Sequence, residues 1–301
     1  MPIRLMENFR AVFYAPYYAT YALGFYAREG VEVELMTSDA PGDAVPKLTD
    51  HSIDITWGGP MRVMKAHDQD KHSSLVSFCE VVSHDPFFLI GKAGSKPFRL
   101  SDLAQMKFAS VSEVPTPWMC LQHDLRESHI APDKLPRIVD RAMGRNYNAL
   151  KAGDLDVMQA FEPFVSMAEQ DKAGDVLYAA SRRGPTAYTA FIATREACAT
   201  YREEFAAMTR ATAKMLGWVY ANPADELATA VSHFFPDVPK AVLTRSLSRY
   251  REAGLWSRET AMNQQGFTRL ADSLHSGGFI TNLPRYDECV ELELNEIRPG
   301  S

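Results

Sequence analysis

Residues 52–60 read SIDITWGGP and predict the fold of the chain, because a strand ends here and a helix begins. The apolar residues Ile53, Ile55 and Trp57 alternate with polar ones, which is the period of a half-buried strand. Two glycines and Pro60 follow, and a helix is expected from Met61, since proline suits the start of a helix. A strand that leads directly into a helix is the unit from which α/β proteins are built.

The same kind of junction recurs twice further along the chain. Residues 112–118 lead from a predicted strand into a helix at Thr116-Pro117-Trp118, and Glu162-Pro163 begins another helix. In open α/β sheets, ligands bind outside the carboxyl ends of the strands, where helix N-termini offer unpaired N–H groups and partial positive charge. A single junction of this kind is equally explained as a well-capped helix. Three in series, spread over two lobes, favour a shared cleft that suits a carboxylate, sulfonate or phosphate.

Strand-like and helix-like runs alternate along the first two thirds of the chain, which predicts crossover units and a mostly parallel sheet. The predicted strands cover residues 4–9, 31–35, 53–57, 107–111, 137–140, 156–160 and 176–178. Beyond residue 195 the chain is predicted to be mostly helical, over 195–221, 224–234, 238–253 and 257–274. Two apolar strands, 87–91 and 188–193, are expected to pair and to carry the chain between lobes. We therefore expect one lobe from residues 1–88 and 189–301, with residues 89–188 inserted as a second lobe across a hinge.

The composition is that of an ordinary soluble globular protein of 301 residues, 46% hydrophobic and 23% charged. The formal net charge of -6 and the pI of about 5.8 argue against nucleic acid as a partner. Apolar runs are far shorter than the ~18 residues of a membrane span, so we predict none. The N-terminal MPIRL lacks a signal-peptide pattern. The protein is thus expected in the periplasm if a signal was removed, and otherwise in the cytoplasm.

Side chains at the strand tips and helix starts are the candidate ligand-binding residues. Flat rings there could hold a planar or methylene-rich ligand, and an arginine could bind a carboxylate with two hydrogen bonds. Arg62 stands in the first turn of its helix, where a cation does not stabilise the helix, so we expect it to serve a ligand anion. The alternatives stay open: the rings could be core, the arginines solvated or ion-paired, and Glu162 either an amine ligand or a helix cap. The predicted site consists of Phe9, Arg10, Tyr17, Trp57, Gly58, Gly59, Arg62, Ser112, Thr116, Trp118, Glu162 and Tyr188, with Arg183 as a further charged candidate.

Patterns of catalytic and metal-binding residues are weak. The eight histidines show no HExxH or paired ligand spacing, and the four cysteines form no CxxC. No GxSxG elbow, Walker loop or GxGxxG follows a predicted strand. We therefore predict no catalytic residue, no metal and no cofactor.

The chain resembles periplasmic-binding-protein-like chains of the nitrate, sulfonate and taurine type, which share a group with the thiamine-pyrimidine-precursor synthases. The resemblance rests on APYY (15–18), GFYAREGVEV (24–33), SIDITWG (52–58), and ALKAGDLDV (149–157) followed by Glu162-Pro163. It covers nearly the whole chain. The resemblance implies a type II binding-protein fold: an α/β protein with two lobes, mixed sheets flanked by helices, and a ligand cleft that closes about a hinge.

The chain departs from the precursor synthases at two places. They carry a lysine and a histidine after the second strand, where Gly58 and Arg62 stand here, and a dense cysteine run where this chain has residues 188–193. Histidine chemistry on a pyridoxal cofactor is therefore not expected.

The sequence predicts a solute-binding protein that captures a small polar organic molecule, of sulfonate, carboxylate, amine or pyrimidine type, for an ABC importer and its permease. The alternative is a cytoplasmic enzyme on the same scaffold: a decarboxylase, a desulfinase or a pyrimidine-precursor synthase. The missing signal peptide favours the enzyme, and the lack of a nucleophile or acid–base pair favours binding. A ligand sensor for a regulatory partner needs only the two-lobed fold and is a third possibility.

Overall fold

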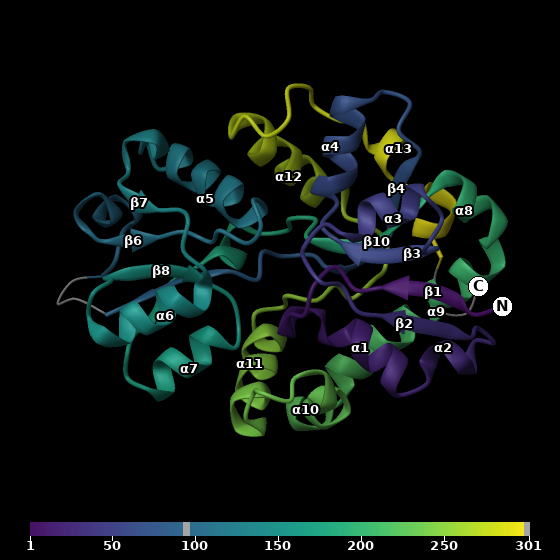
Figure 1. Cartoon of the computed structure of the whole chain (residues 1–301), viewed down its shortest axis with the longest axis horizontal. Helices are drawn as coiled ribbons and strands as arrows, with labels where there is room; N and C mark the ends of the chain where they lie inside the picture. Colours follow the sequence, from purple (N-terminus) through teal and green to yellow (C-terminus); the bar gives the residue numbers. More distant parts are fainter. Residues whose placement is uncertain (93–96, 298–301) are drawn as a thin grey trace.

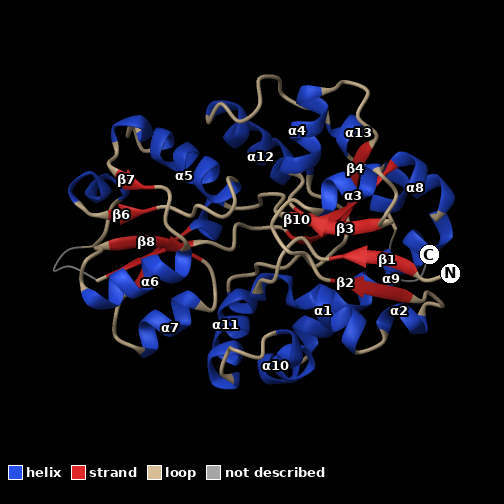
Figure 2. Ribbon diagram, in the orientation of Figure 1, coloured by secondary structure: helices blue, strands red, loops and turns tan. Residues whose placement is uncertain are grey.

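The protein, described here by a computed structural model over residues 1–92 and 97–297, consists of two lobes side by side (Figure 1). Each lobe is built on a five-stranded sheet flanked by helices (Figure 2). The strands are β1 (Ile3–Met6), β2 (Val33–Met36), β3 (Ile55–Gly58), β4 (Leu75–Val82), β5 (Phe88–Gly91), β6 (Phe108–Ala109), β7 (Arg137–Ile138), β8 (Val157–Ala160), β9 (Asp175–Ala179) and β10 (Thr189–Thr194).

The helices follow most strands and fill the last third of the chain, as the sequence predicted. They are α1 (Ala15–Ala22), α2 (Phe25–Arg28), α3 (Ala44–Thr49), α4 (Met61–Gln69), α5 (Thr116–Glu127), α6 (Met143–Ala152), α7 (Phe164–Gln170), α8 (Arg195–Thr200), α9 (Arg202–Ala221), α10 (Ala224–Val231), α11 (Lys240–Glu252), α12 (Gln264–Ser276), α13 (Tyr286–Cys289) and α14 (Leu292–Asn295). Within the ranges described, no helix has both the length and the hydropathy of a membrane-spanning segment.

The sheet of lobe 1 has the order β2-β1-β3-β10-β4, and the sheet of lobe 2 has the order β7-β6-β8-β5-β9. In lobe 1, β1 is parallel to β2 and β3, whereas β10 is antiparallel to β3 and β4. In lobe 2, β6 is parallel to β7 and β8, whereas β5 is antiparallel to β8 and β9. The sheets are therefore mixed, and the expectation of a mostly parallel sheet was wrong. The reason is that β5 and β10 each enter their sheet from the other lobe and run against their neighbours.

The two crossing strands do not pair with each other, which corrects a second prediction. Strand β5 lies between β8 and β9, and β10 lies between β3 and β4, so the two strands belong to different sheets. The connections meet just outside the strands instead: the N–H of Thr186 donates to the carbonyl of Ser83 at 2.7 Å, and that of Tyr188 to Val82 at 3.0 Å. Residues 83–87 and 180–188 thus form a two-stranded bridge between the lobes.

Both faces of the lobe 1 sheet are buried, and successive residues of β10 show how. The Phe191 ring lies 5.8 Å from that of Phe78, in the cluster that includes α1 and α9. Its neighbour Ile192 belongs to the opposite cluster, with α4 and α12. Burial of each such side chain stabilises the fold by roughly 1.5–3 kcal/mol. In lobe 2, α5 covers one face of the sheet, and α6 and α7 cover the other.

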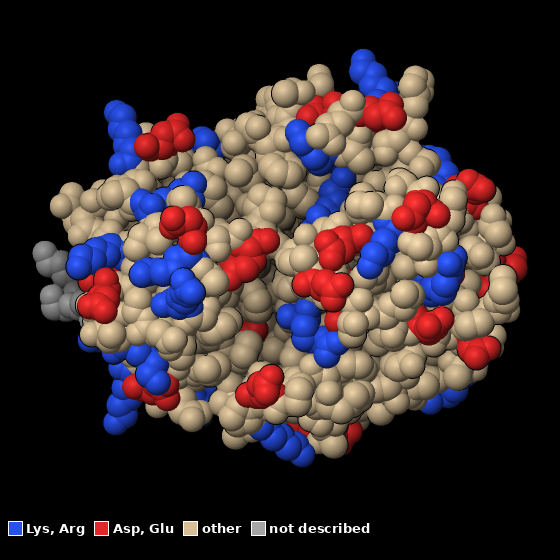
Figure 3. All heavy atoms as spheres, in the orientation of Figure 1, with Lys and Arg blue, Asp and Glu red and all other residues tan. Residues whose placement is uncertain are grey.

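Helices from the end of the chain also brace lobe 2. Helix α12 packs against α5, and α11 packs against α7, on opposite sides of the bridge (Figure 1). The surface is hollowed where the lobes meet, and positive and negative side chains are interspersed over the visible face (Figure 3). The fold therefore brings the ends of strands from both sheets to one junction.

Candidate functional site

A cavity with an empty volume of about 370 Å³ lies at the junction of the lobes. Lobe 1 contributes the segment after β1, the start of α4 and the residue before β10. The bridge and the start of α5 contribute the remaining wall. The lining residues are Asn8, Phe9, Phe13, Tyr14, Gly59, Met61, Arg62, Phe87, Val114, Pro115, Thr116 and Tyr188.

Two helices point their N-termini at this cavity. Helix α4 begins at Met61 after Pro60, and α5 begins at Thr116 with a proline in its first turn. The first N–H groups of a helix have no partner within it and carry partial positive charge, so both ends favour a negative group. Gly59 allows the backbone to approach closely here, because a Cβ at this position would lie 3.3 Å from the Met61 side chain and 3.5 Å from the Tyr188 carbonyl.

Arg62 is the cation of the cavity. Burial lowers the pKa of its guanidinium, and only nearby Tyr14 and Asp43 act against that effect. No hydrogen bond or ion pair joins this guanidinium to the residues described, and those that line the cavity include no aspartate or glutamate. The loop at Gly42 lies against it: a Cβ there would be 2.7 Å from Nη1, and φ is +101°. A partly desolvated charge without a partner is unfavourable unless a ligand supplies the counter-charge.

Two tyrosines and one asparagine add polar groups to the same wall. The Asn8 amide donates to the Tyr14 hydroxyl at 3.4 Å and accepts from the Gly42 N–H at 3.2 Å. Burial raises the pKa of Tyr14 to about 12 and the pKa of Tyr188 well above its ordinary value, so both keep their protons. The buried Tyr188 hydroxyl has no hydrogen-bond partner among the described residues. It is thus available as a donor.

Aromatic rings form the rest of the wall. Phe13 stands edge-on to Phe9 at 5.9 Å and to Tyr188 at 6.5 Å, and the ring of Phe87 lies 6.1 Å from that of Tyr188. Such a wall favours the apolar body of a ligand. The cavity therefore combines one cation, two helix N-termini and an apolar lining.

Five of the twelve predicted site residues line this cavity, and they come from all parts of the wall. These five are Phe9, Gly59, Arg62, Thr116 and Tyr188. Tyr17 and Trp57 lie beneath it in the core of lobe 1, where their rings stack at 4.9 Å with an interplanar angle of 4° and are fully buried. Gly58 lies beside them, where a Cβ would contact Ile192 and Asn8.

The other four predicted residues lie elsewhere. Arg10 pairs with Glu7 at 2.8 Å and donates to the Phe234 carbonyl at 2.8 Å. Trp118 is buried in lobe 2 under the Arg137 guanidinium. Ser112 is exposed and bonds to Glu113.

Glu162 is fully buried at the contact between α7 and α11, away from the cavity. It accepts hydrogen bonds from Arg249 at 2.7 Å, from the Ser166 backbone at 2.9 Å and from Ser246 at 3.1 Å. Its carboxylate therefore both caps α7 and holds the two lobes together, as a buried ion pair requires.

Sequence reasoning missed seven lining residues. They are Asn8, Phe13, Tyr14, Met61, Phe87, Val114 and Pro115. Asn8 carried a usable signal, because it is a polar residue directly after a predicted strand. The aromatic residues carried none, since core and cavity rings look alike in a sequence.

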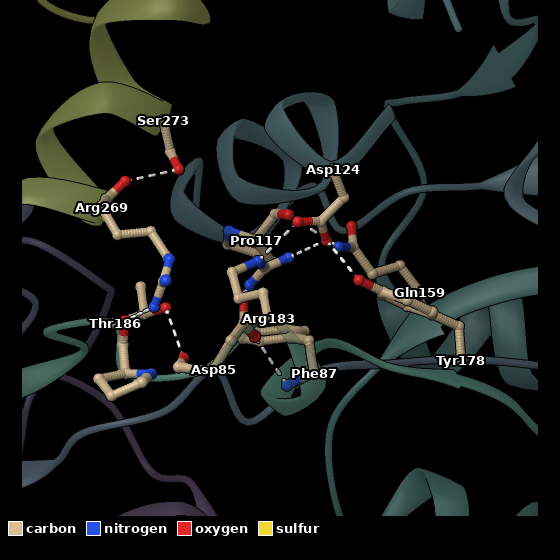
Figure 4. Close-up of polar contacts among 12 residues, drawn as sticks. Asp85, Phe87, Pro117, Asp124, Gln159, Tyr178, Arg183, Thr186, Arg269 and Ser273 are labelled. Atoms are coloured by element: carbon tan, nitrogen blue, oxygen red, sulfur yellow. Dashed lines mark hydrogen bonds and ion pairs between the residues drawn. The ribbon is translucent and has the colours of Figure 1, made fainter. Parts of the chain in front are cut away.

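Arg183 lies at the bridge and holds its two segments together (Figure 4). Its guanidinium bonds to Asp85 at 2.5 Å, on the outgoing segment, and to Asp124 of α5. All three side chains are less than a tenth exposed, and Tyr178 adds a 2.7 Å bond to Asp124. This network fixes α5, whose other end reaches the cavity. Among the residues described, no group of three or more histidine, cysteine, aspartate or glutamate side chains could hold a metal ion.

Two mixed α/β sheets with a ligand-sized cavity between them define the class of protein: a two-lobed chain with the type II periplasmic-binding-protein fold. Within this class, the chain belongs to the family described as NMT1/THI5 like, which it matches over residues 12–226.

Known proteins resemble the chain over nearly its whole length. It is 23% identical over 296 residues to the protein named "Putative binding protein YtlA" of Bacillus subtilis (strain 168), covering 98% of this chain and 89% of YtlA. The ligand-binding component of an ABC-type import system from Staphylococcus aureus, solved with zinc bound, has a TM-score of 0.77 at 18% identity and covers 100% of both chains. The periplasmic aliphatic sulphonate binding protein SsuA from Escherichia coli has a TM-score of 0.74 at 14% identity, over 98% of this chain and 99% of SsuA. The predicted family and fold are confirmed.

Proposed function

We propose that this protein binds a small organic anion in the interlobe cavity and serves as the substrate-binding protein of an ABC-type importer. The observation that carries the proposal is the unpaired guanidinium of Arg62 in a cavity whose described lining holds no carboxylate. The names of YtlA and of the two import proteins agree with the predicted class of protein.

The cavity chemistry narrows the ligand class. A carboxylate or sulfonate would lie between Arg62 and the N-termini of α4 and α5, with the Tyr188 hydroxyl as a further donor. Its apolar body would contact the rings of Phe9 and Phe13. An amine fits poorly, because a cation would face Arg62 without a counter-charge. Of the four ligand types that the sequence left open, the anions are favoured.

The way in which the lobes hold a ligand follows from where the wall residues are anchored. Arg62 and Phe9 belong to lobe 1, and Thr116 belongs to lobe 2. A ligand that touches all three stabilises the closed arrangement over any open one, since it gains contacts only when the lobes meet. We propose that the closed form then docks on a permease, which places the protein on the outer side of the membrane.

The same lining argues against the enzyme alternative. The described cavity residues include no cysteine, histidine, lysine or acidic side chain that could act as nucleophile or general base. Thr116 provides a single hydroxyl, and no base lines the cavity with it.

Thermal unfolding and calorimetry with matched probes test the proposal. Propanesulfonate and benzoate should raise the melting temperature, and at 100 times Kd a ligand stabilises by about 2.7 kcal/mol. Propylamine and benzamide should not. Arg62→Met should weaken anion binding about ten- to a hundredfold, the worth of a hydrogen bond to a charged group. It should leave the unliganded protein folded, because Arg62 has no partner to lose.

A surface variant provides the control. Arg28→Met removes an exposed arginine that donates to the Leu23 carbonyl, and it should bind as the wild type does. The proposal fails if no organic acid stabilises the protein, or if Arg62→Met binds acids with unchanged affinity.

A further inference from the structure

A second hollow, with an empty volume of about 630 Å³, adjoins the cavity at the lobe junction. We call it the outer groove. Lobe 1 contributes the segment after β1 and the segment that connects α10 to α11, and lobe 2 contributes the start of α7. The outer groove is lined by Arg10, Ala11, Val12, Phe161, Pro163, Phe164, Phe234, Phe235, Pro236, Asp237 and Val238.

One aromatic ring separates the outer groove from the cavity. Phe161 lines the groove, and its ring stands edge-on to Phe13 at 5.4 Å and to Phe87 at 5.3 Å. Phe13 and Phe87 line the cavity. Phe9, also in the cavity wall, lies 6.3 Å from Phe161. The two hollows are thus back to back across the single ring of Phe161.

This ring is held in place from several sides. Besides its contacts with Phe13, Phe87 and Phe9, it lies 6.3 Å from Phe164 in its own lobe. Edge-to-face pairs of this kind stabilise each other beyond simple burial. Phe161 is therefore a fixed partition and not a freely moving side chain.

The outer groove is chemically suited to an apolar chain. Four phenylalanine rings and two prolines line it, and its arginine is already engaged, since Arg10 pairs with Glu7 and lies over the Phe234 ring. A second charged group would find no unpaired partner in Arg10. A methylene chain that extended from the cavity would instead bury its surface against rings.

We propose that Phe161 is the specificity-determining residue for ligand length: its ring ends the cavity and excludes acids whose chains would reach the outer groove. This inference rests on the proposed function, because it concerns the far end of the same anionic ligand. Removal of the ring would join the two hollows into one elongated site.

The test uses two series of acids, the linear alkanesulfonates and the linear alkanoates from two to ten carbons, with Kd measured by calorimetry. In the wild type, affinity should fall steeply beyond a certain length. In Phe161→Ala, the fall should move to longer chains, and the longest acids should gain on the order of tenfold or more, the worth of a methylene group in an apolar pocket.

Two further variants make the result decisive. Phe234→Ala widens the outer groove without touching the partition, so it should leave the length limit unchanged. Phe161→Leu keeps an apolar side chain and serves if Phe161→Ala does not fold; it should shift the limit in the same direction by a smaller amount.

The possible outcomes separate this inference from the proposed function. If the wild type binds none of the acids, the proposed function fails. If it binds short acids but Phe161→Ala and Phe161→Leu keep the same limit, or if Phe234→Ala shifts it as much, only the role of Phe161 is refuted. A wild type that binds long and short acids equally well also refutes it.

Discussion

Glu80 is a buried acid whose charge should weaken the fold as the pH rises. It lies in the central strand β4, is 1% exposed, and has one carboxyl oxygen without a hydrogen-bond partner in the described structure. Its other oxygen accepts from the Asn263 N–H at 3.4 Å. Burial raises the pKa of Glu80 from its ordinary value of 4.5 to about 8. The protonated form is therefore the stable one in the folded protein at neutral pH.

The sign and size of the effect follow from this pKa. Between pH 4.5 and about 8 the folded protein retains a proton that the unfolded chain has released, so the free energy of unfolding falls as the pH rises. The interval corresponds to on the order of 5 kcal/mol at its upper end. Glu80→Gln keeps the shape and removes the charge. The variant should match the wild type at pH 4 and exceed it increasingly towards pH 8.

Urea unfolding at pH 4, 6 and 8 measures the difference. Glu29→Gln is the matched control, because Lys214 and Arg210 hold the pKa of Glu29 below its usual range. That carboxylate stabilises the fold above its unfolded pKa and loses its effect as the pH falls, so this variant should lose stability towards neutral pH. If Glu80→Gln and the wild type differ by the same amount at all three pH values, Glu80 does not titrate as argued.

Two core variants follow from the same structure. Trp57→Ala should destabilise the protein by about 3–5 kcal/mol, because it removes a fully buried ring stacked on Tyr17; a variant with an unchanged urea midpoint would show that the ring is not packed. Arg183→Met should also destabilise by about 3–5 kcal/mol, because it leaves the Asp85 carboxylate buried without its cation. In that background Asp85→Asn should restore part of the loss, and an additive double mutant would contradict the ion pair.

Local signals in the sequence located the junctions that bear the site. The proline and glycine residues around Thr116 and Gly59 correctly marked where helices start, and those starts border the cavity. Arg62 was identified on the same basis, since a cation in the first turn needs a reason other than helix stability. What is encoded within about ten residues was therefore predictable.

Features set by distant contacts were not predictable. Trp57 stands at a strand tip, but whether its ring faces a cavity or α1 depends on a helix packed over it. The partners of Glu162 are Ser246 and Arg249, more than 80 residues later. The pairing of β10 was misjudged for the same reason, because apolar patterning gives the period of a strand and not its neighbour.

The position of β10 has a consequence for synthesis on the ribosome. Lobe 2 takes its whole sheet from one continuous stretch, β5 to β9, and can complete it as soon as that stretch has emerged. Lobe 1 cannot, because β4 attaches to its sheet only through β10, about 100 residues later. At ordinary elongation rates this gap lasts on the order of 5–20 s, during which apolar β4 has no strand beside it. The inserted lobe is thus expected to be the first to mature, and the nascent N-terminal half is the part that would most benefit from a chaperone.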